Sequence, residues 1–340
     1  MKIALDAMGH DQGPAKLVAG AALALQEFPE ISKLFLTGDT AILEVELKKI
    51  QCNDRRIEIV HATQVVEMGD SATDALRRKK DSSVSRAVDL VKKGDAEAVV
   101  SAGHTGAAVA ASTVKLRTLP GIERPGIAAT MPTQSNLFVL IDAGANTDPT
   151  PLQTLHNAIM GSVYSRHVLG YKNPSVGLMS IGTEDEKGND FTRLSFELLK
   201  NSALNFRGNV EGHDLFGNPV EVVVADGFTG NIVLKTSEAL AHAIFAWLKH
   251  EIYKSPITKL GALLAKPAFR TIHKKTSAEE YGGMPLLGVN GVCIIAHGGS
   301  SPVAVKNAIR MAAQSIQQQV NPHIIEEIKR YNETHPAPNA

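Results

Sequence analysis

Short apolar runs alternate along the chain with longer stretches in which apolar residues recur at helical spacing. The apolar runs predict strands at 3–5, 34–37, 57–60, 98–101, 127–131, 137–141, 176–180, 222–224 and 292–296. The amphipathic stretches predict helices at 14–28, 82–93, 105–118, 151–169, 190–200 and 229–250. This alternation is typical of βαβ units. The sequence therefore predicts an α/β fold, in which helices cover both faces of a mostly parallel sheet.

The length of the chain bears on how many domains to expect. Its 340 residues exceed the usual size of one hydrophobic core. We expect one large α/β domain over residues 1–330 with a protruding segment at 252–278. Residues 331–340, which include His335-Pro336-Ala337-Pro338, are expected to form a disordered tail.

Polar and glycine-rich residues follow the predicted strands again and again. In a parallel sheet the carboxyl ends of the strands share one edge, so we expect these loops to converge on a single crevice. The loops are Asp6-Ala7-Met8-Gly9-His10-Asp11, Gly38-Asp39, Ser101-Ala102-Gly103-His104-Thr105-Gly106, Asp142-Ala143-Gly144-Ala145-Asn146, Gly182-Thr183-Glu184, Asp226 to Asn231, and His297-Gly298-Gly299-Ser300.

Two of these loops lead directly into predicted helices and indicate an anion site. Gly103 to Gly106 precede an alanine-rich helix, and Thr229-Gly230-Asn231 repeat this arrangement before another helix. Backbone N–H groups at a helix N-terminus attract negative charge, and glycine lets an anion approach them closely. A glycine turn with a threonine cap is the alternative explanation of each loop.

The side chains in the loops suggest chemistry without a covalent nucleophile. Lys187 follows a predicted strand, where its ammonium would neutralise an anionic nucleophile or a developing oxyanion; a solvated charged loop is the alternative. His10, His104 and His297 share no metal-ligand spacing, so we expect no metal site. Motifs of serine hydrolases, P-loop enzymes and ordinary dinucleotide sites are absent from the sequence.

Composition excludes several classes of protein. Thirty-five basic residues balance 35 acidic residues, which argues against a nucleic-acid partner. Cys52 and Cys293 lie far apart, as expected in a reducing cytosol, and Cys293 sits in an apolar run typical of a core residue. No stretch approaches the ~20 apolar residues that span a bilayer. We therefore expect a cytoplasmic protein.

Residues 252–278 contain six basic residues and no acidic residue. Ile257, Leu260 and Leu264 lie at helical spacing, and the pattern breaks at Pro267 before Phe269. The segment predicts two short helices in a hairpin with an apolar tip and a cationic collar. Such a hairpin would bind anionic lipid or dock an acidic protein; a helix packed on its own domain is the alternative. The candidate docking residues are Ile257, Leu260, Leu264, Lys266, Phe269 and Arg270.

Motifs in order over roughly residues 1–320 resemble the phosphate acyltransferases of bacterial phospholipid synthesis. They are Asp6-Ala7-Met8-Gly9 with Asp11 and Gly13-Pro14, Ser101-Ala102-Gly103 with Thr105-Gly106, Pro120-Gly121-Ile122 with Arg124-Pro125, Asp142-Ala143-Gly144-Ala145-Asn146, Ile181-Gly182-Thr183-Glu184, Asp226-Gly227-Phe228-Thr229-Gly230-Asn231, and Gly288-Val289-Asn290-Gly291. The chain departs from the family pattern at His10, usually glycine, and at His104, usually asparagine.

The resemblance implies an enzyme that makes acyl phosphate from acyl-acyl-carrier protein and inorganic phosphate without a cofactor. It also implies a three-layer α/β/α fold similar to phosphate acetyltransferases and isocitrate-type dehydrogenases, a homodimer, peripheral membrane attachment through residues 252–278, and glycerol-3-phosphate acyltransferase as the downstream enzyme. Two rival readings stay open. One is an acetyl-CoA-dependent phosphate acetyltransferase, and the other is a nonenzymatic, membrane-bound, phosphate-sensing scaffold.

The resemblance also assigns roles to residues. Lys187 and Asn231 are the implied catalytic pair, which orients phosphate and stabilises the oxyanion, in an order that the sequence leaves open. The implied phosphate- and substrate-binding residues are Asp6, Met8, Gly9, Ser101, Gly103, His104, Thr105, Gly106, Asp142, Asn146, Asp226, Thr229, Gly230 and His297.

Overall fold

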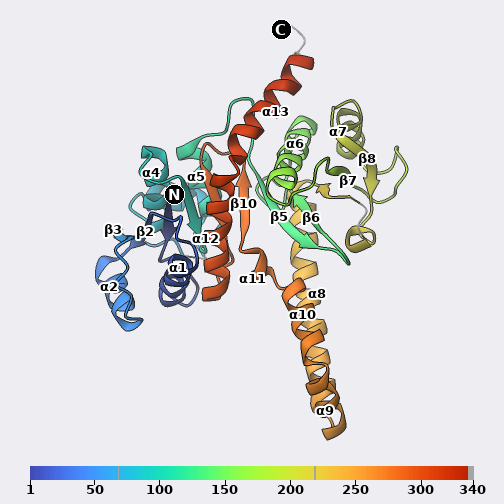
Figure 1. Ribbon diagram of the computed structural model, residues 1–340. Helices are drawn as coiled ribbons and strands as arrows, with labels where there is room; N and C mark the ends of the chain where they lie inside the picture. The colour runs from blue at the N-terminus through green and yellow to red at the C-terminus, as the bar shows by residue number, and fades with distance from the viewer. Residues whose placement is uncertain (68, 218–219, 336–340) are drawn as a thin grey trace.

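The computed structural model describes residues 1–67, 69–217 and 220–335. Within these ranges, eleven strands form one sheet in the order β3-β2-β1-β4-β11-β10-β5-β6-β9-β7-β8 (Figure 1). The strands are β1 Lys2–Asp6, β2 Lys33–Gly38, β3 Ile57–His61, β4 Ala98–Ser101, β5 Gly126–Pro132, β6 Leu137–Ile141, β7 Ser175–Met179, β8 Asn205–Val210, β9 Val222–Val224, β10 Met284–Leu287 and β11 Val292–Ile295.

Helices fill most of the connections between the strands. They are α1 Ala15–Glu27, α2 Thr40–Lys49, α3 Ala72–Arg78, α4 Ser83–Lys93, α5 Thr105–Leu116, α6 Pro151–His167, α7 Asp190–Lys200, α8 Gly227–Tyr253, α9 Pro256–Leu264, α10 Lys266–Thr276, α11 Ala278–Tyr281, α12 Pro302–Gln317 and α13 Val320–Thr334.

The helices form two layers, one on each face of the sheet. One apolar core lies between the sheet and residues of α3, α4, α5 and the first turns of α8. On the other face, α1 and α12 cover one half of the sheet and α6, α7 and α13 cover the other half. The predicted three-layer α/β/α fold with a mostly parallel sheet is therefore confirmed.

The strands fall into two parallel blocks of opposite sense. The block β3-β2-β1-β4-β11 is parallel throughout, and so is the block β6-β9-β7-β8. Between them, β10 is antiparallel to both β11 and β5, and β5 is antiparallel to β6. Along the ladder, the two blocks therefore point their carboxyl ends in opposite directions.

Each predicted strand is present to within one residue at either end, because buried parallel strands are continuous apolar runs. Two strands were not predicted. β8 contains Gly208 and little apolar surface, and β10 contains Pro285, which normally argues against a central strand. Pro285 is accommodated because β10 pairs with β11 through its first half and with β5 through its second half.

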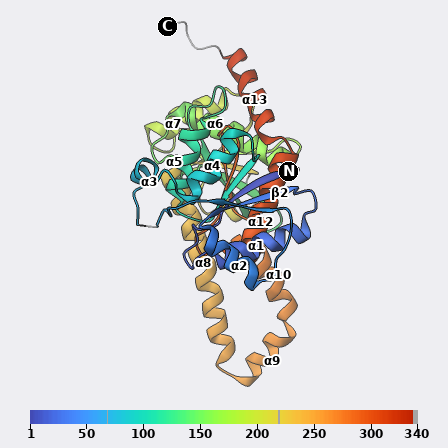
Figure 2. The same ribbon diagram turned by 90° about the vertical axis from the view of Figure 1, so that its left-hand side faces the viewer.

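The segment that protrudes from the body is longer than residues 252–278. α8 runs for 27 residues out of the body, α10 returns alongside it, and α9 lies at the far end (Figures 1 and 2). The rings of Phe245 and His273 join the two arms with centroids 5.4 Å apart. The second half of α8 is thus the outgoing arm, and we call this arm with α9 and α10 the hairpin.

The predicted tail at 331–340 requires a correction at its start. Residues 331–334 form the last turn of α13, whose Val320, Ile324 and Ile328 are buried in the core with α6. Tyr331 packs against the same core, which keeps this turn helical. Residues 336–340 lie outside the described residues.

Candidate active site

The loops after β1, β4 and β11 lie together because these strands are neighbours with aligned ends. In the ladder Ser101 pairs with both Asp6 and Ile295. The buried Asp6 carboxylate accepts a 2.8 Å hydrogen bond from the Ser101 hydroxyl. Burial raises the pKa of the Asp6 carboxyl, and the hydroxyls of Ser83 and Ser101 oppose the rise. Asp6 therefore braces the loops rather than facing solvent. Residues 6–11, 101–106 and 296–300 are the first loop group.

Two glycines let the loops of this group touch. A Cβ added to Gly9 would lie 2.8 Å from the Cα of Gly103, and one added to Gly103 would lie 3.0 Å from the Cα of Gly9. The side chain of Met8 packs against Gly38 in the same way: a Cβ added to Gly38 would lie 2.5 Å from the Cγ of Met8. These predicted site residues pack the loops against one another.

His10 and His104, the two departures from the family pattern, both stabilise loops. Buried His10 donates from Nε2 to the Ser300 carbonyl at 2.9 Å, and its Nδ1 accepts from the N–H of Gln12 at 3.0 Å. His104 is the N-cap of α5, where its Nδ1 accepts from the N–H of Ala107 at 3.1 Å. A ring nitrogen thus caps this helix as an asparagine oxygen does elsewhere.

The start of α5 keeps unused backbone donors. Thr105 is exposed and Gly106 is half-buried, and within the described chain neither amide has a hydrogen-bond acceptor. His297 is exposed on a neighbouring loop, where its Nδ1 accepts from the N–H of Gly299 at 3.0 Å. Open amides at the positive end of a helix dipole suit an anion.

The loops after β6, β9 and β7 form the second loop group, residues 142–146, 180–189 and 225–231. Their strands end together, since Val224 pairs with both Ile141 and Leu178. Lys187 and Asn231 both belong to this group, so the structure places the implied catalytic pair on loops at the ends of adjacent strands.

Asp142 is buried at the base of the second loop group. Its Oδ1 accepts from the backbone N–H groups of Ile127, Gly144 and Ala145 at 3.0, 2.9 and 2.8 Å, and its Oδ2 accepts from that of Asn146 at 2.6 Å. Burial raises the pKa of the Asp142 carboxyl, and the four N–H donors oppose the rise. The donors of this loop are therefore occupied by a side chain of the protein itself.

Backbone N–H groups at the start of α8 also donate hydrogen bonds to acceptors of the protein itself. Asp226 caps the helix, accepting from the N–H and the hydroxyl of Thr229 at 2.8 and 2.7 Å. The N–H of Gly227 donates to the Asn146 carbonyl and that of Gly230 to the Asp226 carbonyl, both at 2.9 Å. This corrects the prediction that the backbone of Thr229 and Gly230 forms an open cradle for an anion.

Gly230 is required by the close approach of two loops. A Cβ added to Gly230 would lie 1.9 Å from the carbonyl oxygen of Asp142. The next residue, Asn231, donates from Nδ2 to the carbonyl of Ala143 at 3.1 Å. The glycine therefore lets the first turn of α8 press its Asn231 onto the 142–146 loop.

Lys187 extends from a loop that is tied to β8. Its Nζ lies 3.8 Å from Glu184 Oε1, and its side chain is 47% exposed. The Glu184 carbonyl accepts from the N–H of Lys187 at 3.1 Å and from Nδ2 of buried Asn209 at 2.7 Å. The ammonium group thus remains available at the surface of an anchored loop.

The two loop groups do not follow one edge of a single parallel sheet, because the two blocks of strands run in opposite senses. Among the described residues, no hydrogen bond or ion pair joins the two loop groups. Both groups nevertheless border the same layer of the molecule. Ala107 of α5 and Leu234 of α8 belong to one continuous apolar core on one face of the sheet.

Lys235 is a site candidate that the sequence analysis missed. It is exposed on α8 and, within the described residues, forms no ion pair. It follows Asn231 by four residues, so both side chains lie on one face of the helix. The four-residue spacing of Asn231 and Lys235 within a predicted helix could have revealed this candidate in the sequence.

The docking residues predicted for the hairpin are mostly exposed. Ile257, Leu260 and Leu264 are 82, 61 and 77% exposed, and Leu263 beside them is 63% exposed. Phe269 is half-buried, whereas Lys266 and Arg270 are exposed. The end of the hairpin thus carries a bare apolar surface next to cationic side chains.

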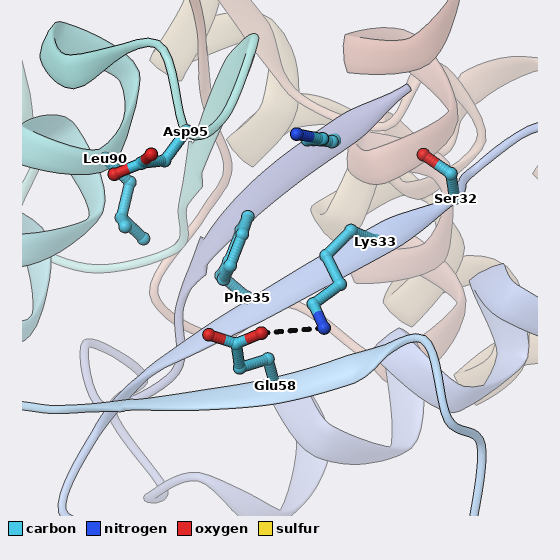
Figure 3. Close-up of a pocket in the computed structure, with 7 residues that line it drawn as sticks. Ser32, Lys33, Phe35, Glu58, Leu90 and Asp95 are labelled. Atoms are coloured by element: carbon cyan, nitrogen blue, oxygen red, sulfur yellow. Dashed lines mark ion pairs between the residues drawn. The ribbon is translucent and has the colours of Figure 1, made fainter.

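Two hollows of the surface lie away from the two loop groups. The larger, of about 600 Å³, is lined by Lys2, Lys33 and Glu58 at the amino ends of β1, β2 and β3, with an ion pair of 2.6 Å between the last two residues (Figure 3). A second, of about 280 Å³, lies between the β5–β6 turn and the base of the hairpin. Neither contains a predicted catalytic or phosphate-binding residue.

Among the described residues, no group of three or more His, Cys, Asp or Glu side chains is placed to hold a metal ion. No helix in the described part of the chain is long and apolar enough to cross a membrane. Cys293 is buried, as expected of a core residue, and burial raises the pKa of its thiol to about 11.

Comparisons of sequence find relatives over nearly the whole chain. A family model described as fatty acid synthesis protein matches residues 1–323. A phosphate acyltransferase of Akkermansia muciniphila is 51% identical over 336 residues, which cover 97% of this chain and 96% of the relative. One of Geobacter sulfurreducens is 48% identical over 329 residues, covering 97% and 94%.

Comparisons of structure find the same fold in more distant proteins. The EutD phosphotransacetylase from Staphylococcus aureus matches with a TM-score of 0.61 at 17% identity, covering 93% of this chain and 94% of the other. A phosphotransacetylase from Streptococcus pyogenes also matches with a TM-score of 0.61, at 20% identity and the same coverage. The predicted similarity to phosphate acetyltransferases is therefore confirmed at the level of the fold.

Proposed function

Because the chain belongs to the fatty acid synthesis protein family and is 51% identical to a phosphate acyltransferase over almost its full length, we infer that it is itself a phosphate acyltransferase. The full-length match carries this conclusion, because both loop groups lie within the 1–323 range of the family model. The enzyme transfers an acyl group to inorganic phosphate.

The chemistry needs no general base. A phosphate oxygen attacks the carbonyl carbon of an acyl thioester, the C–S bond breaks, and the products are acyl phosphate and a thiolate that takes up a proton. Phosphate is already an anion at neutral pH, so the protein must mainly hold the two reactants together and stabilise the tetrahedral oxyanion. Orientation and one donor to the oxyanion each contribute several kcal/mol, about 3–4 for the donor.

We assign the phosphate to the start of α5 and the oxyanion to the second loop group. The amides of Thr105 and Gly106 are open donors at a helix N-terminus, whereas those of Gly227, Thr229 and Gly230 at the start of α8 are engaged. Lys187 supplies an ammonium from an anchored loop, and Asn231 and Lys235 share one face of α8. In this assignment the substrates bind between the N-terminal ends of α5 and α8, which border one apolar core.

The hairpin favours a long acyl chain on a carrier protein over acetyl-CoA. A small, soluble acetyl donor needs no protruding apolar surface, whereas delivery of a long acyl phosphate to lipid synthesis does. We propose acyl carrier protein as the thiol carrier, and an anionic membrane surface as the partner of the exposed Ile257, Leu260 and Leu264. Glycerol-3-phosphate acyltransferase is the proposed consumer of the product.

A second copy of the chain is the proposed partner of α8. Leu240, Ile244 and Trp247 lie on one face of this helix and are 53, 50 and 64% exposed. Large apolar side chains gathered on one face typically mark a contact with a partner. Sedimentation velocity of the full chain should show a dimer, and a monomer at all micromolar concentrations contradicts this assignment.

Incubation of the purified chain with phosphate and either palmitoyl-acyl-carrier protein or acetyl-CoA tests the function. We expect acyl phosphate and free carrier protein from the first mixture, at a rate well above that with acetyl-CoA. Turnover of acetyl-CoA alone identifies an acetyltransferase. No turnover with either donor leaves only the nonenzymatic scaffold.

A further inference from the structure

Two large apolar side chains stand exposed beside the implied catalytic pair, on loops that are otherwise polar. Phe228 is 61% exposed in the first turn of α8, and Ile181 is 83% exposed just after β7. Single exposed apolar residues are common on protein surfaces and need no explanation. These two differ because each follows closely after the end of one of two adjacent strands.

The strand register sets how close these residues lie. β9 and β7 are adjacent and parallel, and Val224 pairs with Leu178. Ile181 follows Leu178 by three residues, and Phe228 follows Val224 by four. Both side chains therefore emerge just beyond the aligned ends of neighbouring strands.

Each apolar residue is also next to one member of the catalytic pair. Phe228 precedes Asn231 by three residues and Ile232 by four, so these three side chains share one face of α8. Ile232 is 49% exposed and extends the apolar surface by one turn. Ile181 opens the loop that carries Lys187. The exposed apolar residues thus lie on the same two segments of the chain that carry the implied catalytic pair.

We propose that Phe228 and Ile181 bind the acyl chain of the substrate and determine the preference of the enzyme for long chains. This inference rests on the proposed function. The acyl chain is bonded to the carbonyl carbon that phosphate attacks, so it must leave the catalytic pair across an adjacent surface. Covering Phe228, Ile181 and Ile232 removes their apolar area from water, which favours each added methylene of the chain.

This surface is distinct from the face of α8 assigned to a second copy. Phe228 and Leu240 are twelve residues apart, which at about 100° per residue places them roughly 120° apart around the helix axis. The Phe228 surface lies at the start of α8, next to Asn231. The face with Leu240, Ile244 and Trp247 lies along its middle. One occupant does not account for both.

Calorimetry with palmitoyl phosphonate and butyryl phosphonate, unreactive analogues of acyl phosphates, tests the proposal without turnover. The wild-type chain should bind the palmitoyl compound more tightly. Phe228→Ala should weaken palmitoyl binding about tenfold or more, the size expected when one large apolar contact is lost, with a much smaller loss for butyryl. Ile181→Ala should act in the same direction. Val114→Ala, at a residue 62% exposed on α5, is the matched control and should change neither affinity.

The outcomes separate this proposal from the proposed function. Equal affinity of the wild type for both phosphonates, equal losses for both in Phe228→Ala, or a change in sedimentation of that variant overturns the acyl-chain role. Turnover of palmitoyl-acyl-carrier protein is measured in parallel. Selective binding of palmitoyl phosphonate without turnover supports the acyl-chain site and contradicts the proposed function. Turnover without selective binding supports the proposed function and contradicts the acyl-chain site.

Discussion

Lys187 is the residue on which the proposed chemistry depends most. Its loop is anchored to β8 through the Glu184 carbonyl and Asn209, while its ammonium group stays at the surface, 3.8 Å from Glu184. Such an arrangement holds a positive charge in place without neutralising it through a close ion pair. The side chain is then free to meet charge that develops on the substrate.

Lys187→Ala should lower kcat by at least about a hundredfold, because one electrostatic stabiliser of the transition state is lost. The substitution removes a half-exposed side chain, so the thermal midpoint should change little. Steady-state assays and thermal unfolding measure both effects. Lys172→Ala, at an exposed lysine outside both loop groups, is the control. Wild-type turnover in the Lys187 variant would exclude this residue from the site.

Gly230 offers a test of the packing between the 142–146 loop and the start of α8. A methyl group at this position would lie 1.9 Å from the Asp142 carbonyl oxygen, so Gly230→Ala must displace the start of α8. We expect a loss of about 1–3 kcal/mol in the free energy of unfolding, together with reduced activity. Gly261→Ala is the control, since an added Cβ there meets open space within α9. Unchanged stability in Gly230→Ala contradicts the close packing.

At the scale of elements, the hairpin allows membrane binding to be tested separately from catalysis. Six positive side chains each gain up to ~1 kcal/mol near an anionic surface, a contribution that salt screens. Exposed leucines at the tip each add ~1–2 kcal/mol on leaving water, which salt does not screen. The two contributions come from one segment, at the opposite end of α8 from the second loop group (Figure 1).

Leu260→Glu combined with Leu264→Glu should abolish sedimentation with anionic vesicles, because it removes apolar surface and adds negative charge at the tip. Turnover of acyl-carrier protein in solution should persist. Ile42→Glu with Val45→Glu, at residues 43 and 49% exposed on α2, is the matched control and should still bind vesicles. If binding survives the hairpin substitutions, the anchor lies elsewhere; if turnover falls with binding, the hairpin serves the active site.

The packing of α13 on α6 should depend on pH. The rings of His167 and His323 stack with centroids 3.8 Å apart, beside an ion pair of 3.0 Å between Arg166 and Glu327. Burial first, and then the charges of His323 and Arg166, lower the pKa of His167 below its ordinary value of 6.5. The unfolded chain therefore binds more protons than the folded chain just below that pH, and stability falls as the pH decreases through this window.

We expect the free energy of unfolding of the wild type to decrease from about pH 7 to about pH 5, and His323→Asn to reduce part of this decrease. Near pH 8 the His167 ring is neutral, so the variant should differ little from the wild type there. Urea unfolding across this range measures the slopes. An unchanged slope in His323→Asn contradicts a role for the stacked pair.

For the whole molecule, local pattern predicted the elements better than their arrangement. Buried strands such as Val222–Val224 are continuous apolar runs, which makes them visible in the sequence. The opposite sense of the two strand blocks depends on the short strand β10, which contains Pro285 and joins the nearby strand β11 to the distant strand β5. The expectation that all these loops follow one edge of a parallel sheet failed for that reason.

The candidate site was predictable in its residues but not in their contacts. Asp226 follows a strand as expected, yet its carboxylate occupies the backbone N–H of Thr229, which was predicted to face an anion. A side chain competes with a ligand for the same N–H groups, and the sequence does not reveal which one binds there. Only the start of α5, with Thr105 and Gly106, keeps the open donors that the pattern indicated.

Transfer of radiolabelled inorganic phosphate tests the central claim most directly. The purified full chain is incubated with palmitoyl-acyl-carrier protein and labelled phosphate, and label is counted in the lipid-soluble acyl phosphate. We predict that label appears there in equal amount to the free carrier protein released, and that Lys187→Ala reduces it at least about a hundredfold. Release of free carrier protein without labelled acyl phosphate would show a thioesterase instead and contradict the account.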